Sequence, residues 1–310
     1  MGPQLRTRKQ KTIMVAAMRI RFIINPSSGR EKSRETMIAV SKFLLEDGHE
    51  ISARYTSKKD DACSFAAEAV RDEVDRIVVI GGDGTVNEVV AGIVSQDSKI
   101  PLTIIPCGTT NDFAKFMDLC KSNYENYESI VGDNFKDIDV GVCNNKYFIN
   151  VGAVGILTDV AHNTPKSLKS VFGRTAYVLK AISEINPENL KPMNMTIESE
   201  EYSEELMAYL FLISNTQSIG GFDKMAPLAS VSDGKLDCII VKDMPIVDLI
   251  SCFMKIREGE HINHDGVVYF QSSDVKLQCD QEVELDVDGE YFGDLPAHFS
   301  VFQEALRITL

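Results

Sequence analysis

Residues 18–116 alternate between short apolar runs and longer segments in which apolar residues recur at helical spacing. The runs at 18–25, 49–56, 76–80 and 101–106 are typical of strands, and the segments that follow them are typical of helices. The run at 76–80, RIVVI, has no polar residue after its arginine, as expected of a strand covered on both faces. This alternation predicts an α/β domain built on a parallel sheet.

The pattern changes after about residue 135, where runs typical of antiparallel strands are separated by short turns. The pair Asn144-Asn145 between two such runs is a hairpin signal. Single cores rarely grow beyond about 250 residues, so a chain of 310 residues favours two domains. The expected parts are a flexible leader at 1–17, the α/β domain at 18–135, a mostly antiparallel β domain at 136–300, and a C-terminal strand at 301–310 that could return to the first domain. Two helices are expected within the second domain, near 167–185 and 245–257.

Composition and charge exclude several classes of protein. The net charge is −14, whereas general nucleic-acid binding needs a basic face, so no nucleic-acid partner is expected. The longest apolar run, at 206–213, is far shorter than the roughly 20 residues that span a bilayer. The seven cysteines are scattered and form no CxxC pair, which favours reduced thiols and a cytoplasmic location.

Three glycine-containing loops follow the first, third and fourth predicted strands: NPSSG at 25–29, GGDGT at 81–85 and PCGTTND at 106–112. Ligands of open α/β sheets bind at the carboxyl ends of parallel strands. Each loop also opens a helix, and free amides with small hydroxyls at a helix N-terminus suit phosphate groups. We call them the three phosphate loops. An acid in such a loop, Asp83, needs a separate explanation.

No familiar nucleotide motif accounts for these loops. The P-loop pattern GxxxxGK[ST] does not occur, and the dinucleotide pattern GxGxxG fails because Asn87 occupies the position of the third glycine. The protein-kinase motifs HRD and DFG are absent as well.

Four stretches together point to a family: NPSSG, GGDGTVNEV, PCGTTNDFA and SDGKLDCIIV. From about Met18 to Leu310 the chain resembles the diacylglycerol kinase catalytic family of bacterial soluble lipid kinases, which is related to sphingosine and ceramide kinases. GGDGT alone also occurs in NAD kinases and 6-phosphofructokinases, so the combination carries the resemblance. It implies an NAD kinase/diacylglycerol kinase-like α/β domain followed by a mostly antiparallel, β-sandwich-like domain.

The resemblance also implies an ATP-dependent lipid kinase that transfers the γ-phosphoryl group to a lipid hydroxyl. Diacylglycerol is the first expectation for the acceptor, which would give phosphatidic acid. A sphingosine-like lipid, phosphatidylglycerol, and the soluble acceptor of an NAD kinase-like enzyme stay open as alternatives. A non-catalytic binding protein on the same fold is disfavoured because the set of acids is intact.

By the same resemblance, ATP is the co-substrate and Mg²⁺ accompanies it. A cation would explain an acid beside phosphate-binding amides, since Asp83 could orient the metal or the attacking hydroxyl. The implied ATP-binding residues are Asn25, Pro26, Ser27, Ser28, Gly29, Thr56, Gly82, Asp83, Gly84, Thr85, Val86, Asn87, Glu88 and Thr109.

A structural Mg²⁺ is implied at SVSDGKL, which we call the cation loop (residues 230–236). Its ligands would be the Asp233 carboxylate and the carbonyls of Ser230 and Lys235, and hard oxygen donors are what Mg²⁺ prefers. Asp112 and Asp139 would belong to a water-linked carboxylate network around it. The Asp-Gly pair is also a turn signal in its own right, and both interpretations can hold together.

Glu290 in DVDGE occupies the family position of the proton acceptor, and Asp83 is the rival base. The alternative interpretation of VELDVDGEYFG is a plain hairpin. In that hairpin Val283, Leu285 and Val287 would point inward and the acids outward.

A lipid acceptor implies peripheral association with a membrane surface. Lys166, Lys169 and Arg174 flank apolar residues within 165–174 and could form a short basic and apolar helix face for anionic lipid. An ordinary surface helix packed by its apolar side is the alternative. A homodimer is compatible with the sequence.

Overall fold

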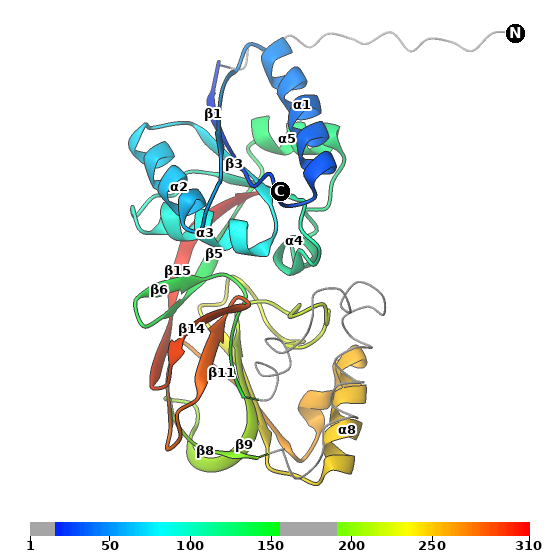
Figure 1. The fold of residues 1–310 in the computed structure, drawn as a ribbon, viewed down its shortest axis with the longest axis vertical. Helices are drawn as coiled ribbons and strands as arrows, with labels where there is room; N and C mark the ends of the chain where they lie inside the picture. The colour runs from blue at the N-terminus through cyan, green and yellow to red at the C-terminus, as the bar shows by residue number, and fades with distance from the viewer. Residues whose placement is uncertain (1–15, 156–190) are drawn as a thin grey trace, which may run out of the picture.

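A computed structural model describes residues 16–155 and 191–310 of the chain. Within these ranges the chain forms two domains arranged along the long axis of the molecule, and two long strands run between them (Figure 1). The helix expected near 167–185 and the basic and apolar face expected at 165–174 lie outside the described residues.

The first domain is a parallel sheet with helices on both faces. Its strands are ordered β4-β3-β1-β2, and Ile20 of β1 lies opposite Ile51 of β2 and Arg76 of β3. The strands are β1 (Arg19–Ile24), β2 (Glu50–Tyr55), β3 (Arg76–Gly81) and β4 (Leu102–Pro106). The helices are α1 (Arg30–Glu46), α2 (Asp61–Arg71), α3 (Asp83–Val94), α4 (Asp112–Phe116) and α5 (Asn123–Val131).

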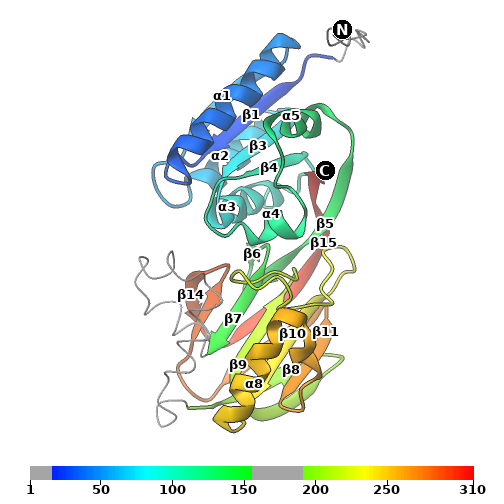
Figure 2. The ribbon, with the colours of Figure 1, turned by 90° about the vertical axis from the view of Figure 1, so that its right-hand side faces the viewer.

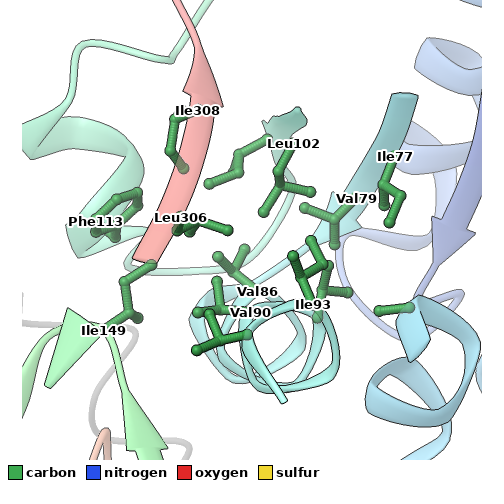
Figure 3. Close-up of a cluster of buried hydrophobic side chains, with 14 of the residues drawn as sticks. Ile77, Val79, Val86, Val90, Ile93, Leu102, Phe113, Ile149, Leu306 and Ile308 are labelled. Carbon is green, nitrogen blue, oxygen red and sulfur yellow. The ribbon is translucent and has the colours of Figure 1, made fainter. Parts of the chain in front are cut away.

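Alternate residues of these strands fill two cores, one on each side of the sheet. On one side Phe22 and Val78 are fully buried in the cluster that includes α1 and α5. On the other side Ile77 and Val79 are fully buried against α2 and α3. Figure 3 shows Val86, Val90 and Ile93 of α3 facing this second side of the sheet. Strand β3 is therefore apolar at every position after Arg76 because both of its faces are covered, as the run at 76–80 predicts.

The second domain is mostly antiparallel β-structure. Its strands are β6 (Lys146–Phe148), β7 (Val151–Gly155), β8 (Met193–Glu198), β9 (Ser203–Ser214), β10 (Leu236–Lys242), β11 (Val267–Ser272), β12 (Asp274–Cys279), β13 (Glu284–Val287) and β14 (Glu290–Asp294). The helix α8 (Ile246–Lys255) is followed by the 3₁₀ turns η2 (Ile256–Glu258) and η3 (Glu260–Asn263). The main path of this sheet runs β14-β13-β7-β9-β8-β12, and β10 pairs with β9 and β11.

Two strands belong to both domains: β5 (Phe135–Cys143) and β15 (Ala297–Thr309). Strand β15 pairs with β5 along both its first and its last part. Its first part also pairs with β12, and its last part places Ile308 opposite Leu102 of β4. Figure 2 shows β15 and β5 side by side from the lower domain into the upper one. The sheets of the two domains are thus joined through one continuous C-terminal strand.

Both hairpins that the sequence indicates are present. Asn144 (φ 44°) and Asn145 (φ 70°) form the turn between β5 and β6, and Asp288 (φ 50°) with Gly289 (φ 84°) forms the turn between β13 and β14. Positive φ at both central residues matches the right-handed twist of paired strands. Helix α5 and strand β11 were not predicted from the sequence. In the part of the chain that the structure describes, no helix is long and apolar enough to cross a bilayer.

Candidate functional site

The three phosphate loops lie together at the carboxyl ends of β1, β3 and β4, and they bind one another. The Asn25 side-chain amide donates to the Thr85 hydroxyl at 2.9 Å, which joins the first loop to the second. The Asn111 backbone amide donates to Asp83 Oδ2 at 2.8 Å, which joins the third loop to the second. The loops therefore form a single preformed surface.

Glycines allow these loops to touch through their backbones. A Cβ on Gly108 would lie 2.6 Å from the Gly82 Cα, and a Cβ on Gly29 would lie 2.5 Å from the Cys107 carbonyl oxygen. Gly29 also has a φ of +60°, a conformation that favours glycine. Loop packing thus explains part of the glycine content of these loops.

Two helix N-termini point free amides at this surface. The first backbone bond of α3 runs from Val86 N to Gly82 O, and that of α1 runs from Ser33 N to Gly29 O. The amides of the residues before Val86 and before Ser33 in each first turn have no partner within the helix. Such amides, together with the helix dipole, form an anion site.

A positive side chain acts on the same surface. Burial raises the pKa of the Cys107 thiol in the third loop, and the positive charge of Lys32 opposes that shift. Pro26, Ser27 and Thr109 are exposed on the loops, and Ser28 is half-buried. The Thr56 amide donates to Ile24 O at 2.9 Å, so Thr56 continues the edge strand β2 beside the first loop.

Three of the predicted nucleotide residues face the protein instead. Val86 is buried in the core beneath β3. Glu88 Oε2 accepts the Ala62 amide at 3.1 Å, and burial is the main cause that raises its pKa. Asn87 Oδ1 is buried and has no hydrogen-bond partner among the described residues. Their side chains support the loop from below.

Glu290 comes from the second domain but reaches the first. It is the first residue of β14, and its Oε2 lies 2.5 Å from Lys59 Nζ, in the connection between β2 and α2. Both side chains are more than half exposed, at 55% and 65%. The turn between β13 and β14 therefore meets the first domain beyond the carboxyl end of β2, and the Glu290 carboxylate is open to solvent.

Asp288, two residues earlier, is an acid that sequence reasoning did not select. Its carboxylate accepts the backbone amides of residues 149–151 at 2.9–3.0 Å. Burial is the main cause that raises its pKa to about 6, and the negative charge of Asp83 adds to the shift. The two acids therefore interact electrostatically across the domain boundary. The signal was present in DVDGE, but an Asp-Gly pair is explained equally well by a turn.

The inward and outward pattern expected for the β13–β14 hairpin holds for its apolar residues but not for all of its acids. Leu285 and Val287 are buried, and Val283 is partly buried. Asp286, expected to point outward, is only 7% exposed, and its Oδ1 accepts the Gly289 amide at 2.8 Å. The carboxylate is turned inward because it stabilises the tight turn.

Asp139 lies next to the cation loop. Its Oδ2 accepts the Gly234 amide at 2.7 Å, and its Oδ1 accepts the Glu304 amide at 2.8 Å. Within the loop, the Lys235 amide donates to Asp233 Oδ1 at 3.1 Å. Asp112 is bound elsewhere, since its Oδ1 accepts the Ser218 hydroxyl and the Gly221 amide, both at 3.2 Å. Asp139 thus contacts the loop directly, whereas Asp112 contacts the segment that leads toward it.

Two protein families match the two halves of the chain. The model described as "Diacylglycerol kinase catalytic domain" matches residues 19–143, and the one described as "YegS C-terminal NAD kinase beta sandwich-like domain" matches residues 151–310. Together with the observed sheets, these matches confirm the α/β plus β-rich fold class that the sequence indicates.

Curated relatives match over nearly the whole chain. A diacylglycerol kinase of Bacillus subtilis (strain 168) is 37% identical over 295 residues, which cover 94% of this chain and 96% of the relative. A diacylglycerol kinase of Staphylococcus aureus (strain MRSA252) is 37% identical, with 91% and 89% covered. A crystal structure from Bacillus anthracis str. Sterne has the same fold, with a TM-score of 0.83, 24% identity and 97% of each chain covered.

Proposed function

Because the chain belongs to the diacylglycerol kinase catalytic domain family, we propose that it transfers the γ-phosphoryl group of ATP to the free hydroxyl of diacylglycerol, giving phosphatidic acid and ADP. One observation supports this most directly. The phosphate loops of the first domain and the Glu290 turn of the second meet at one site, joined by the Lys59–Glu290 pair. Phosphoryl transfer depends mainly on such positioning of a nucleotide, an acceptor and a proton acceptor.

In this proposal ATP lies along the three phosphate loops. The free amides at the start of α1 and α3, with Lys32, stabilise the phosphate charges. Asn25, Ser27, Ser28, Gly29, Gly82, Gly84, Thr85 and Thr109 surround the phosphates, and Thr56 lies toward the nucleoside. Val86, Asn87 and Glu88 support the second loop from beneath.

Transfer then needs a proton acceptor for the lipid hydroxyl. We assign this role to Glu290, whose exposed carboxylate projects from the second domain. The hydroxyl oxygen forms a bond to the γ-phosphorus, its proton passes to Glu290, and the bond between the γ-phosphorus and the bridging oxygen breaks to release ADP. Asp83, held by the Asn111 amide, keeps the second and third loops in register beside the reacting groups.

The cation loop suits Mg²⁺. It offers the Asp233 carboxylate and the carbonyls of Ser230 and Lys235, all of them hard oxygen donors. Among the described residues no cluster of three or more His, Cys, Asp or Glu could hold a metal, so backbone carbonyls would be needed here. A cation would stabilise the loop, and Mg²⁺ bound with ATP would neutralise phosphate charge.

A water-insoluble acceptor requires the protein to act at a bilayer surface. We propose that this association is peripheral and reversible and takes place on the cytoplasmic side. In the described ranges no helix could span a membrane. The net charge of −14 opposes anionic lipid, so contact must be local. Assembly as a homodimer stays a prediction, which sedimentation velocity would test.

The function is tested with labelled ATP and mixed micelles of a single acceptor. Diacylglycerol should give labelled phosphatidic acid, whereas sphingosine, phosphatidylglycerol and NAD should be phosphorylated far less. Glu290→Gln and Asp83→Asn should each lower kcat by at least about a hundredfold with the fold intact. Preferred phosphorylation of another acceptor, or full activity of both variants, would overturn the assignment.

A further inference from the structure

The segment 149–151, between β6 and β7, belongs to both domains. Ile149 is fully buried in the core of the first domain, and its side chain lies beside those of Phe113 and Leu306 (Figure 3). Val151 starts β7 and packs in a core of the second domain. Any shift of this segment would therefore move one domain relative to the other.

Asp288 uses every amide of this segment. The Ile149 amide donates to Asp288 Oδ2 at 2.9 Å, and the Asn150 and Val151 amides donate to Oδ1 at 3.0 and 2.9 Å. The Asp288 amide donates in return to Val151 O at 2.9 Å. The turn that carries Glu290 is thus fixed to segment 149–151 by four hydrogen bonds.

Asn215 holds the opposite side of the same segment. Its backbone amide donates to Asn150 O at 2.8 Å, and its side-chain Nδ2 donates both to Ile149 O at 3.3 Å and to Asp139 O at 3.0 Å. Asp139 in turn binds the Gly234 amide of the cation loop. A single buried side chain therefore links the cation loop and β5 to the segment that anchors Glu290.

The chemistry of Asn215 favours a positioning role over a purely stabilising one. The residue is fully buried, and its Oδ1 has no hydrogen-bond partner among the described residues. An unpaired acceptor in the interior costs free energy, so an amide at this position is not the choice that maximises stability. The Nδ2 group, by contrast, donates both of its hydrogens, one to the backbone carbonyl of Asp139 and one to that of Ile149.

We propose that Asn215 is a positioning residue for phosphoryl transfer, which sets the place of Glu290 by holding segment 149–151 against β5. Asp288 completes the connection from that segment to the turn. The kinetic consequence rests on the proposed function, whereas the effect on the turn does not.

Asn215→Asp tests this with little change of shape. A carboxylate has no hydrogen to donate and would place a negative charge against two carbonyl oxygens. Hydrogen exchange of the amides in 288–292, measured by mass spectrometry, should become about tenfold faster, while 61–71 and 83–94 keep their protection. The kcat for diacylglycerol should fall at least about tenfold, with KM for ATP within about threefold, because the phosphate loops are untouched.

Tyr209→Phe is the matched control. Tyr209 is buried in the same domain and donates to Asp243 Oδ1 at 2.7 Å, and neither residue bonds to segment 149–151. It should lower Tm while leaving kcat and the exchange of 288–292 as in the wild type. If the two substitutions lower Tm equally and also change kcat and the exchange of 288–292 equally, the proposal is overturned, because Asn215 would then contribute only stability.

Asp288→Asn weakens the hydrogen bonds between segment 149–151 and the turn that carries Glu290. This second variant tests the proposal even if Asn215→Asp does not fold. It should reproduce the faster exchange in 288–292 and the loss of kcat with an unchanged KM for ATP. Unchanged exchange in this variant would also overturn the proposal. If exchange changes as expected but the wild type phosphorylates no diacylglycerol, the positioning inference stands and the proposed function fails.

Discussion

Arg307 in β15 and Asp137 in β5 form a two-point ion pair, with Nε 2.8 Å from Oδ1 and Nη2 2.9 Å from Oδ2. The two residues face each other in the antiparallel register of these strands. The pair therefore stabilises the part of β15 that lies in the first domain, after the strand has crossed from the second.

This pair predicts an acid-dependent contribution to stability. The hydrogen bond from Arg307 is the largest cause that lowers the pKa of Asp137 below its ordinary value near 4. Because the folded-state pKa is depressed, the stabilisation is present at neutral pH and is lost as the pH falls below about 4. Asp137→Asn should lower the free energy of unfolding by about 1–2 kcal/mol at pH 7 and by much less at pH 3, in urea titrations at both values.

Asp133→Asn serves as the control for that measurement. Asp133 is 92% exposed and lies 3.5 Å from Arg76, so its pair should contribute less than about 0.5 kcal/mol at either pH. An Asp137→Asn variant with the same loss of stability at pH 3 and pH 7 would contradict the assigned ion pair.

The Lys59–Glu290 pair predicts an effect on activity without an effect on stability. Both side chains are largely exposed, so Lys59→Ala should change Tm by less than about 3 °C. Loss of the tether should nevertheless lower kcat severalfold, because Glu290 is then held less firmly toward the nucleotide. Lys59→Arg should restore most of the rate, and Lys58→Ala should leave it unchanged. A kcat of Lys59→Ala equal to that of the wild type would show that the pair does not position Glu290.

Backbone contact between the loops predicts a binding defect at Gly108. The Cβ of Gly108→Ala would lie 2.6 Å from the Gly82 Cα and 2.7 Å from Asn111 Oδ1, so the second and third loops must separate. Binding of an ATP analogue, measured by calorimetry, should weaken, with the dissociation constant rising at least about tenfold. Gly84→Ala, whose Cβ would meet no atom within 4 Å, is the stability control and should keep the wild-type Tm. If Gly108→Ala binds the ATP analogue as tightly as the wild type does, close contact between the second and third loops is not needed for binding.

The cation loop predicts a metal-dependent stability. A ligand that binds only the folded state raises Tm, so Mg²⁺ titrated into the wild type without nucleotide should raise it, and Asp233→Asn should blunt the rise. Asp294→Asn, in an exposed edge strand, is the matched control and should respond as the wild type does. Equal Tm responses of the wild type and Asp233→Asn would count against the site.

Local sequence patterns determined much of the protein. The alternation of apolar runs and helical segments predicted the order of strands and helices in the first domain. The spacing of apolar residues in a strand or a helix depends on local backbone geometry, so a few neighbouring residues reveal it. Loop composition likewise located the phosphate loops, whose glycines, hydroxyls and amides act within a few residues of one another. The pairs Asn144-Asn145 and Asp288-Gly289, which have positive φ, were likewise recognisable as turns from the sequence.

Only the tertiary structure decided which distant segments meet. No local pattern marks the contacts of Asp288 and Asn215, since their partners in 149–151 are more than 60 residues away in the chain. The Lys59–Glu290 pair spans 231 positions and depends on how the second domain is placed against the first. The path of β15 across both sheets was equally undetermined, because a strand pattern specifies which faces are buried but not which strand will be its neighbour.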